Sequence, residues 1–182
     1  EAQRHNIPVV LQISLAQEMA GLPAFRQGLR FTAYTEGWAL YAEHLAWELG
    51  WYEDDPYRYL GFLQAMAFRA ARLVVDTGLH ARGWTFSEAE AFLTANTGFE
   101  NQDPIPPQQQ VARYLVWPGQ ATSYYVGYTT LIDLRQRAMD HLGDQFDLKD
   151  FHRVIVSQGS VPLPVLEVVV DQYIAEILAS TS

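Results

Sequence analysis

The chain has 182 residues, with 12 basic and 21 acidic side chains for a formal net charge of −9, and 49% of its residues are hydrophobic. This composition is typical of a globular protein and not of a disordered one. The excess of acidic charge argues against nucleic acid or an anionic membrane as the main partner. The absence of cysteine excludes disulfides and thiolate sites, so any metal must be bound by His, Asp or Glu.

Helical patterns dominate the chain, whereas alternating strand patterns are weak. Glycine and proline stop signals and helix-capping residues divide the sequence into segments. Thr85 and Glu88 have the spacing of a capping box, and Gly50 is positioned to end a long helix. The sequence predicts helices over residues 7–20, 23–50, 56–81, 85–96, 111–117, 119–142, 147–157 and 164–178.

The segment 98–110 contains three prolines and three consecutive glutamines, so it is predicted to be a long loop or linker. The predicted fold is a single all-α domain over residues 1–182 with about seven or eight helices. No apolar run approaches the ~20 residues that a membrane span requires. The first six residues show no signal-peptide pattern. We therefore expect a soluble protein, and the sequence assigns no compartment.

Two glutamates on the second predicted helix, Glu36 and Glu43, are seven residues apart and lie on nearly the same face among aromatic and aliphatic residues. A partly buried carboxylate needs a cation, hydrogen-bond donors or a proton, which makes each a candidate metal ligand or general base. Alternatively, both lie at the edge of the apolar face and pair with arginines of a neighbouring helix.

A polar stripe on the third predicted helix is formed by Arg69, Arg72, Asp76 and His80 at steps of three, four and four residues. In this spacing Asp76 can accept the imidazole N–H of His80, as the carboxylates beside metal-bound or catalytic histidines do. The alternative is an ordinary surface pair of Arg72 with Asp76, with His80 near the helix C-terminus.

A third cluster contains Arg113, Tyr114, the Pro-Gly-Gln turn at 118–120, and Tyr124 and Tyr128 on one helix face. Phenol and guanidinium donors there are suited to binding an oxyanion during hydrolysis, while aromatic packing beside a helix start is the alternative. No H-E-x-x-H, G-x-S-x-G, P-loop, dinucleotide-binding or EF-hand pattern is present.

Four blocks resemble the bacterial domain-of-unknown-function family 885. They are TEGWALYAE at 35–43, RAARLVVDTGLH at 69–80, RY at 113–114 with PGQA at 118–121, and FH at 151–152 with PL at 162–163. The resemblance extends from about residue 12 onward and matches the C-terminal part of longer family members. It implies an all-α zinc-metallopeptidase-like fold related to carboxypeptidase Taq and thimet oligopeptidase.

The sequence departs from that family at its start. Members carry an H-E-x-x-P-G-H-H segment that supplies metal ligands and the general base, whereas here Pro8, Val9 and Val10 stand where P-G-H-H is expected. His5 and Asn6 precede them roughly where H-E is expected. The resemblance implies that Glu36 is a metal ligand, that Asp76 and His80 line the site, and that Arg113, Tyr114 and Tyr124 contact substrate or an oxyanion.

The leading hypothesis is a divalent-metal hydrolase, with zinc as the expected metal, that uses metal-activated water on an ester, amide or phosphoester bond. Glu36 and His80, with His5 or Glu43, would bind the metal, and Glu43 is the alternative base. Asp76 would orient His80, while Arg113 and Tyr124 would stabilise negative charge. A small-molecule or peptide-like substrate is expected.

The alternative hypothesis is a non-catalytic fragment that acts as a binding or oligomeric module. The chain has 24 aromatic residues, and these must be buried or face a partner. Loss of a preceding part of the family fold would expose an apolar face, and self-association would bury it. A homo-oligomer, most simply a dimer, is therefore expected.

Overall fold

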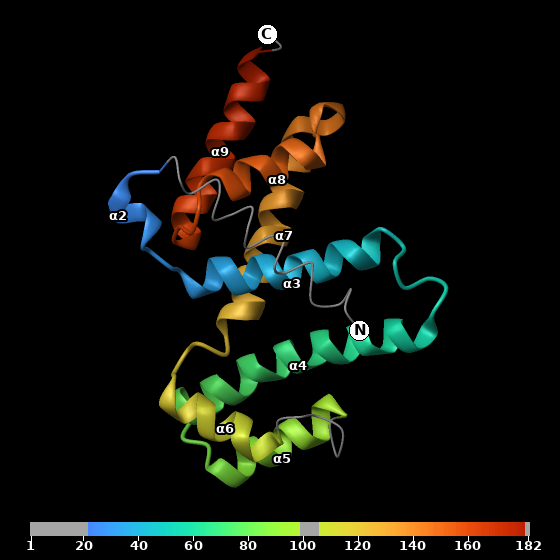
Figure 1. The fold of residues 1–182 in the computed structure, drawn as a ribbon, viewed down its shortest axis with the longest axis vertical. Helices are drawn as coiled ribbons and strands as arrows, with labels where there is room; N and C mark the ends of the chain where they lie inside the picture. The colour runs from blue at the N-terminus through green and yellow to red at the C-terminus, as the bar shows by residue number, and fades with distance from the viewer. Residues whose placement is uncertain (1–21, 99–105, 181–182) are drawn as a thin grey trace. The chain divides into compact units, whose positions relative to one another are not determined.

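The computed structural model describes residues 22–98 and 106–180, and every regular element within them is helical (Figure 1). Eight α-helices and one short 3₁₀ helix occur in these ranges, which confirms the predicted all-α class. The elements are α2 (Ala24–Gln27), α3 (Thr32–Glu48), α4 (Pro56–Ala81), α5 (Phe86–Thr97), α6 (Pro107–Val116), α7 (Ser123–Leu142), η1 (Gly143–Gln145), α8 (Leu148–Ser157) and α9 (Leu163–Ser180).

The described chain divides into two compact units, which are treated separately. Unit 1 comprises residues 22–35 and 129–180, and unit 2 comprises residues 36–98 and 106–128. Helices α3 and α7 each contribute residues to both units. The expectation of one domain over residues 1–182 stays a prediction. No helix in the described ranges is long and apolar enough to cross a membrane.

Unit 2 is built on α4, which packs against α5 and α6 (Figure 1). The Asp55 carboxylate caps α4 by accepting the N–H groups of Tyr57 and Arg58, and Pro56 occupies the first turn, where its missing N–H costs nothing. The α4–α5–α6 core is formed by Ala71, Val75, Ala89, Leu93, Val111, Tyr114 and Ala121. Burial of this apolar surface fixes α4 and α6, the two helices that carry the candidate site.

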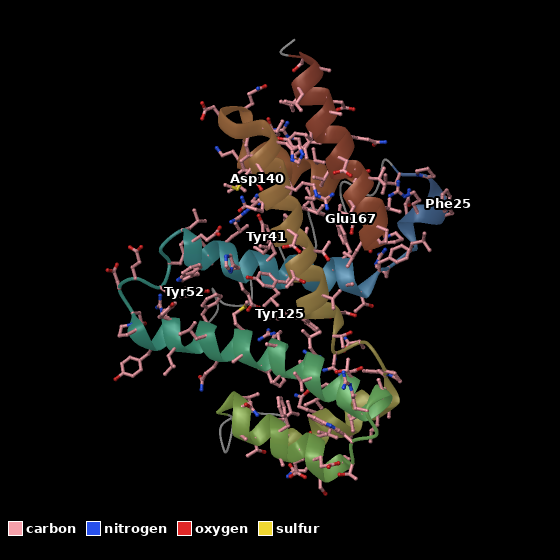
Figure 2. All side chains as sticks on the ribbon, turned by 180° about the vertical axis from the view of Figure 1, so that it is seen from behind. Phe25, Tyr41, Tyr52, Tyr125, Asp140 and Glu167 are labelled. Carbon is pink, nitrogen blue, oxygen red and sulfur yellow. The ribbon has the colours of Figure 1, made fainter. Side chains whose placement is uncertain are left out.

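Two glycines permit close packing within unit 2. A Cβ on Gly37 would lie 2.4 Å from the carbonyl carbon of Gly127, so α3 approaches the backbone of α7 where neither residue has a side chain. A Cβ on Gly78 would lie 2.5 Å from the indole ring of Trp84. At the opposite end of α4, Figure 2 shows Tyr52 in the loop between α3 and α4, where its ring stacks on Phe62.

Unit 1 contains α2, α8, α9 and most of α7; Figure 2 labels Asp140 on α7 and Glu167 on α9. The Asp147 carboxylate accepts two backbone N–H groups at the start of α8. The Tyr34 hydroxyl donates to the carbonyl of Ile155 at 2.9 Å, which ties the start of α3 to α8. The buried apolar residues here include Leu131, Leu134, Ala138, Phe151, Ile155, Leu166 and Val170.

Most predicted boundaries agree with the structure, and two require correction. The expected continuous helix over 23–50 is wrong, because α2 ends at Gln27 and α3 begins at Thr32. Between them the Phe31 N–H donates to the Ser160 hydroxyl at 2.8 Å instead of to a carbonyl four residues earlier. The segment 98–110 is also not all loop, since α6 begins at Pro107 and includes the three glutamines. The predicted helix over 7–20 lies outside the described residues.

Candidate anion-binding site

The candidate site lies in unit 2 and is centred on Arg72, which α4 places among aromatic rings. Only 4% of Arg72 is exposed. Its guanidinium carbon lies 4.3 Å from the ring centroid of Tyr124 and 5.5 Å from those of Phe68 and Tyr114. These are cation–π distances, and each ring face attracts the positive charge while excluding water from it.

A second arginine, Arg113 on α6, converges on the same acceptor as Arg72. The Arg113 Nη2 donates to Gln120 Oε1 at 2.9 Å, and the Arg72 Nη2 donates to the same oxygen at 3.4 Å. The Arg113 guanidinium carbon also lies 5.7 Å from the ring centroid of Trp117. Two cations therefore share one neutral amide oxygen.

The hydrogen bonding of both arginines is incomplete within the described residues. The Nε atoms of Arg72 and Arg113 are buried and have no acceptor there. Neither arginine forms an ion pair within the described ranges, in contrast to most buried arginines. A buried donor without a partner costs about 1–3 kcal/mol, and more when it is charged. The free donors of the cluster are suited to binding an anion.

The turn that presents Gln120 is held by Asp76. Both carboxylate oxygens of Asp76, which is 3% exposed, accept the backbone N–H of Gly119 at 3.0 and 3.1 Å. Gly119 has φ of +78°, a conformation that favours glycine. Asp76 therefore fixes the backbone at Gly119, the residue directly before Gln120.

Tyr114, whose ring contacts Arg72, is itself held by hydrogen bonds to Gln110 and His80. The Tyr114 hydroxyl donates to Gln110 Oε1 at 3.3 Å, and His80 Nε2 donates to the Tyr114 carbonyl at 3.0 Å. Burial raises the pKa of Tyr114 to about 12, despite the opposing effects of Arg72 and Arg113. Tyr114 is therefore a neutral phenol at physiological pH, and it acts as a hydrogen-bond donor.

The predicted pairing of Asp76 with His80 is wrong. Asp76 bonds to Gly119 and His80 bonds to the Tyr114 carbonyl, because α6 and the following turn offer both side chains partners that their own helix does not. The suggested surface pair of Arg72 with Asp76 is also not formed: both residues are buried, and Arg72 bonds to Gln120. Spacing along one helix does not report the partners that a neighbouring element supplies.

The two glutamates of α3 have different surroundings. Glu43 Oε1 lies 3.4 Å from Nη2 of Arg69 on α4. For Glu43, this agrees with the alternative prediction that the glutamate pairs with an arginine of a neighbouring helix. Partial burial raises the pKa of Glu43, and the Arg69 charge offsets part of that effect. Glu36 is half-buried. His44 lies beside Glu43 in sequence and bonds to the Tyr128 hydroxyl and to Glu48.

The described residues do not assemble a metal site. Within residues 22–98 and 106–180, no group of three His, Asp or Glu side chains is arranged to hold a metal ion. His5, one of the three expected ligands, lies outside the described ranges. The expected set of Glu36, His80 and His5 stays a prediction.

Three of the predicted site residues, Arg113, Tyr114 and Tyr124, lie in this cluster. The side chains at its centre belong to Arg72 and Gln120, for which the sequence predicts only a place in a polar stripe and in the Pro-Gly-Gln turn. Arg113 and Tyr124 do lie in the cluster, on opposite sides of the Pro-Gly-Gln turn. The Tyr124 hydroxyl makes no hydrogen bond within the described residues. The sequence signal for Gln120 is its position in the Pro-Gly-Gln turn, seven residues after Arg113.

Comparison with known families identifies the chain through most of its length. Residues 10–170 match the family described as "Bacterial protein of unknown function (DUF885)". The chain belongs to the DUF885 family. This confirms the resemblance drawn from the four sequence blocks. The further kinship with zinc metallopeptidases stays a prediction. A comparison with functionally curated proteins gave no match.

A solved structure also matches the DUF885 chain. It is "the putative lipoprotein from Colwellia psychrerythraea", with 45% sequence identity and a TM-score of 0.85. The match covers 91% of this chain and 28% of that one. The chain therefore spans about a quarter of that protein's length.

Proposed function

We propose that this DUF885 chain carries the substrate-anion-binding part of a hydrolase that acts on an ester, amide or phosphoester bond. The observation that supports the proposal is the convergence of Arg72 and Arg113 on a single neutral oxygen. Guanidinium groups bind anionic oxygens through paired, charge-assisted hydrogen bonds. In a water-poor aromatic setting such bonds are stronger than at the surface.

The role of each residue follows from its contacts. Arg72 and Arg113 hold a negatively charged group of the substrate. Asp76 acts as a positioning residue, since both of its carboxylate oxygens accept the Gly119 N–H and so fix the backbone next to Gln120. Tyr124, whose ring lies against the Arg72 guanidinium, supplies its hydroxyl as a donor for negative charge that develops during hydrolysis.

A divalent metal, with zinc as the expected ion, stays a separate prediction beside this anion-binding proposal. Within residues 22–98 and 106–180 no group of three His, Asp or Glu side chains is arranged to hold it, and the roles given above to Arg72, Arg113, Asp76 and Tyr124 do not require it. Elemental analysis of the purified chain tests this part. Stoichiometric zinc that is lost on replacing Glu36 and His80 would support the expected ligand set, and a metal-free chain that binds anions would remove it.

The catalytic proposal is tested with a panel of chromogenic esters, phosphoesters and short peptides. We expect turnover of anionic members, with KM raised about tenfold or more in Arg113→Gln and unchanged in the control Arg58→Gln, whose side chain is exposed and pairs with Asp55. Anion binding without turnover of any substrate would assign a binding module in place of a hydrolase.

A second candidate function, a self-associating module, is favoured by the C-terminal end of α6. Three consecutive apolar residues there, Leu115, Val116 and Trp117, are exposed, with Val116 at 72%. An exposed apolar run of this kind marks an interaction site more often than an isolated exposed side chain does. Sedimentation at micromolar concentration distinguishes the two states: a dimer that dissociates in Val116→Asp supports this candidate, and a monomeric wild type contradicts it.

A further inference from the structure

The charges of the cluster indicate which anion it takes. Arg72 and Arg113 contribute two positive charges, and Asp76, which also influences Tyr114 electrostatically, contributes one negative charge. One positive charge therefore remains uncompensated. Burying an uncompensated charge is costly, and a single negative charge cancels it while a doubly charged group would reverse it. The balance favours a monoanion.

The Gln120 side chain stands where an anion would bind. Its Oε1 accepts from both arginines, at 2.9 and 3.4 Å, as one oxygen of a carboxylate would. An amide oxygen carries no net charge, so these bonds are weaker than the charge-assisted bonds to a carboxylate. Exchanging the amide for a carboxylate oxygen therefore improves both interactions.

The local geometry allows this exchange without movement of the helices. Gln120 is half-buried, and it belongs to the turn between α6 and α7 and not to either helix. The Asp76 carboxylate holds the Gly119 backbone independently of the Gln120 side chain. Rotation of one glutamine side chain is enough to free an Nη2 donor on each arginine.

The aromatic surroundings favour an organic acid over a small inorganic ion. Tyr124 lies against Arg72, and Trp117, 57% exposed, lies against Arg113. An apolar group attached to the carboxylate would cover part of the exposed Trp117 ring and remove apolar surface from water. A hydrated inorganic anion gains nothing from that surface.

We propose that an organic monocarboxylate displaces the Gln120 side chain and is held by Arg72 and Arg113. This inference rests on the anion-binding role proposed above and names its ligand class. The Gln120 amide is then an internal substitute that keeps the two cations bonded while the ligand is absent.

The test is isothermal titration of the full chain with benzoate, with neutral benzamide and inorganic phosphate as comparison probes. We expect benzoate to bind and benzamide not to bind. Gln120→Ala should bind benzoate at least as tightly as the wild type, since nothing must be displaced. Gln120→Glu should bind it tenfold or more weakly, because its own carboxylate occupies the arginines. The exposed Gln109 supplies the matched control, and Gln109→Glu should bind like the wild type.

Each contrary result is informative. Tighter binding of phosphate than of benzoate would overturn the carboxylate assignment and leave the anion-binding role in place. Equal binding of benzoate and benzamide, or unchanged binding by Gln120→Glu, would overturn the displacement of Gln120. Failure of the wild type to bind any anion would overturn the proposed function as well. Circular dichroism of each variant shows that a loss of binding is not a loss of fold.

Discussion

Two arginines three residues apart on α4 have opposite surroundings. Arg69 is more exposed, with a side chain 24% accessible, and has a carboxylate partner in Glu43. Arg72 is 4% exposed, and within the described residues its side-chain hydrogen bond goes to the neutral amide of Gln120. The more deeply buried charge is thus the one without a counter-charge in direct contact. Stability alone would favour the reverse arrangement, since a buried unpaired charge is expensive. The proposed anion-binding role of Arg72 accounts for this difference, whereas Arg69 already has its counter-charge.

The largest expected effect comes from removing the one carboxylate of the site. We expect Asp76→Ala to lower the free energy of unfolding by about 3 kcal/mol, because it leaves Arg72 and Arg113 uncompensated and the Gly119 N–H without its acceptor. Urea unfolding monitored by circular dichroism measures the change. Asp76→Asn keeps an acceptor without the charge and should lose less. Equal stability of Asp76→Ala and the wild type would contradict the bracing role.

The second largest effect is expected from Gln120→Glu, which would give Arg72 a carboxylate partner of the kind that Arg69 already has in Glu43. Gln120→Glu should raise the free energy of unfolding by about 1–2 kcal/mol at neutral pH, because neutral hydrogen bonds become charge-assisted ones. Thermal unfolding measures this gain, with Gln109→Glu as the control for added surface charge. A destabilised Gln120→Glu would show that the cluster does not carry excess positive charge.

A smaller effect is expected when the paired arginine is removed. Arg69→Gln should cost less than about 1 kcal/mol, because a part-exposed ion pair contributes little after side-chain entropy and screening. It should leave benzoate affinity unchanged. Loss of benzoate binding in Arg69→Gln, in a variant that remains folded, would remove the distinction between the two arginines.

The smallest expected effect is the change in folding stability with pH that comes from the titration of Glu43. Burial raises the pKa of Glu43 in the folded chain above its ordinary value of 4.5, so the folded state binds this proton more tightly than the unfolded state does. The resulting stability is present at low pH and is lost as pH rises from about 4.5 through the raised pKa. The stability of the wild type relative to Glu43→Gln should therefore fall between pH 4 and 7. A relative stability that rises with pH would show that the Arg69 interaction outweighs burial.

Local sequence signals predicted those parts of the fold that depend on neighbouring residues. The start of α4 at Pro56 follows from the Asp55 cap beside it, and α5 follows from the Thr85–Glu88 capping box, which the structure contains. The break before α3 was not predictable, because the acceptor of the Phe31 N–H is Ser160, 129 residues away. A hydrogen bond of that range leaves no mark in local periodicity.

In the candidate site too, features set by neighbouring residues are predictable and contacts between distant residues are not. Helical spacing predicts that Arg72, Asp76 and His80 share one stripe, and it favours pairing among these three residues. In the structure their partners are Gln120, Gly119 and Tyr114, which lie on or next to α6. The family resemblance singled out Arg113, Tyr114 and Tyr124 as contacts, and their catalytic roles stay predictions.

Nuclear magnetic resonance of the arginine side chains tests most directly whether Arg72 and Arg113 bind the ligand. In ¹⁵N-labelled protein the Nε–H resonances of Arg69, Arg72 and Arg113 are assigned with single Arg→Lys variants and then followed during addition of benzoate. We predict saturable shifts of the Arg72 and Arg113 resonances with a common dissociation constant, and an unchanged Arg69 resonance. Equal shifts at all three arginines, or none at Arg72 and Arg113, would contradict the conclusion that these two cations form the ligand site.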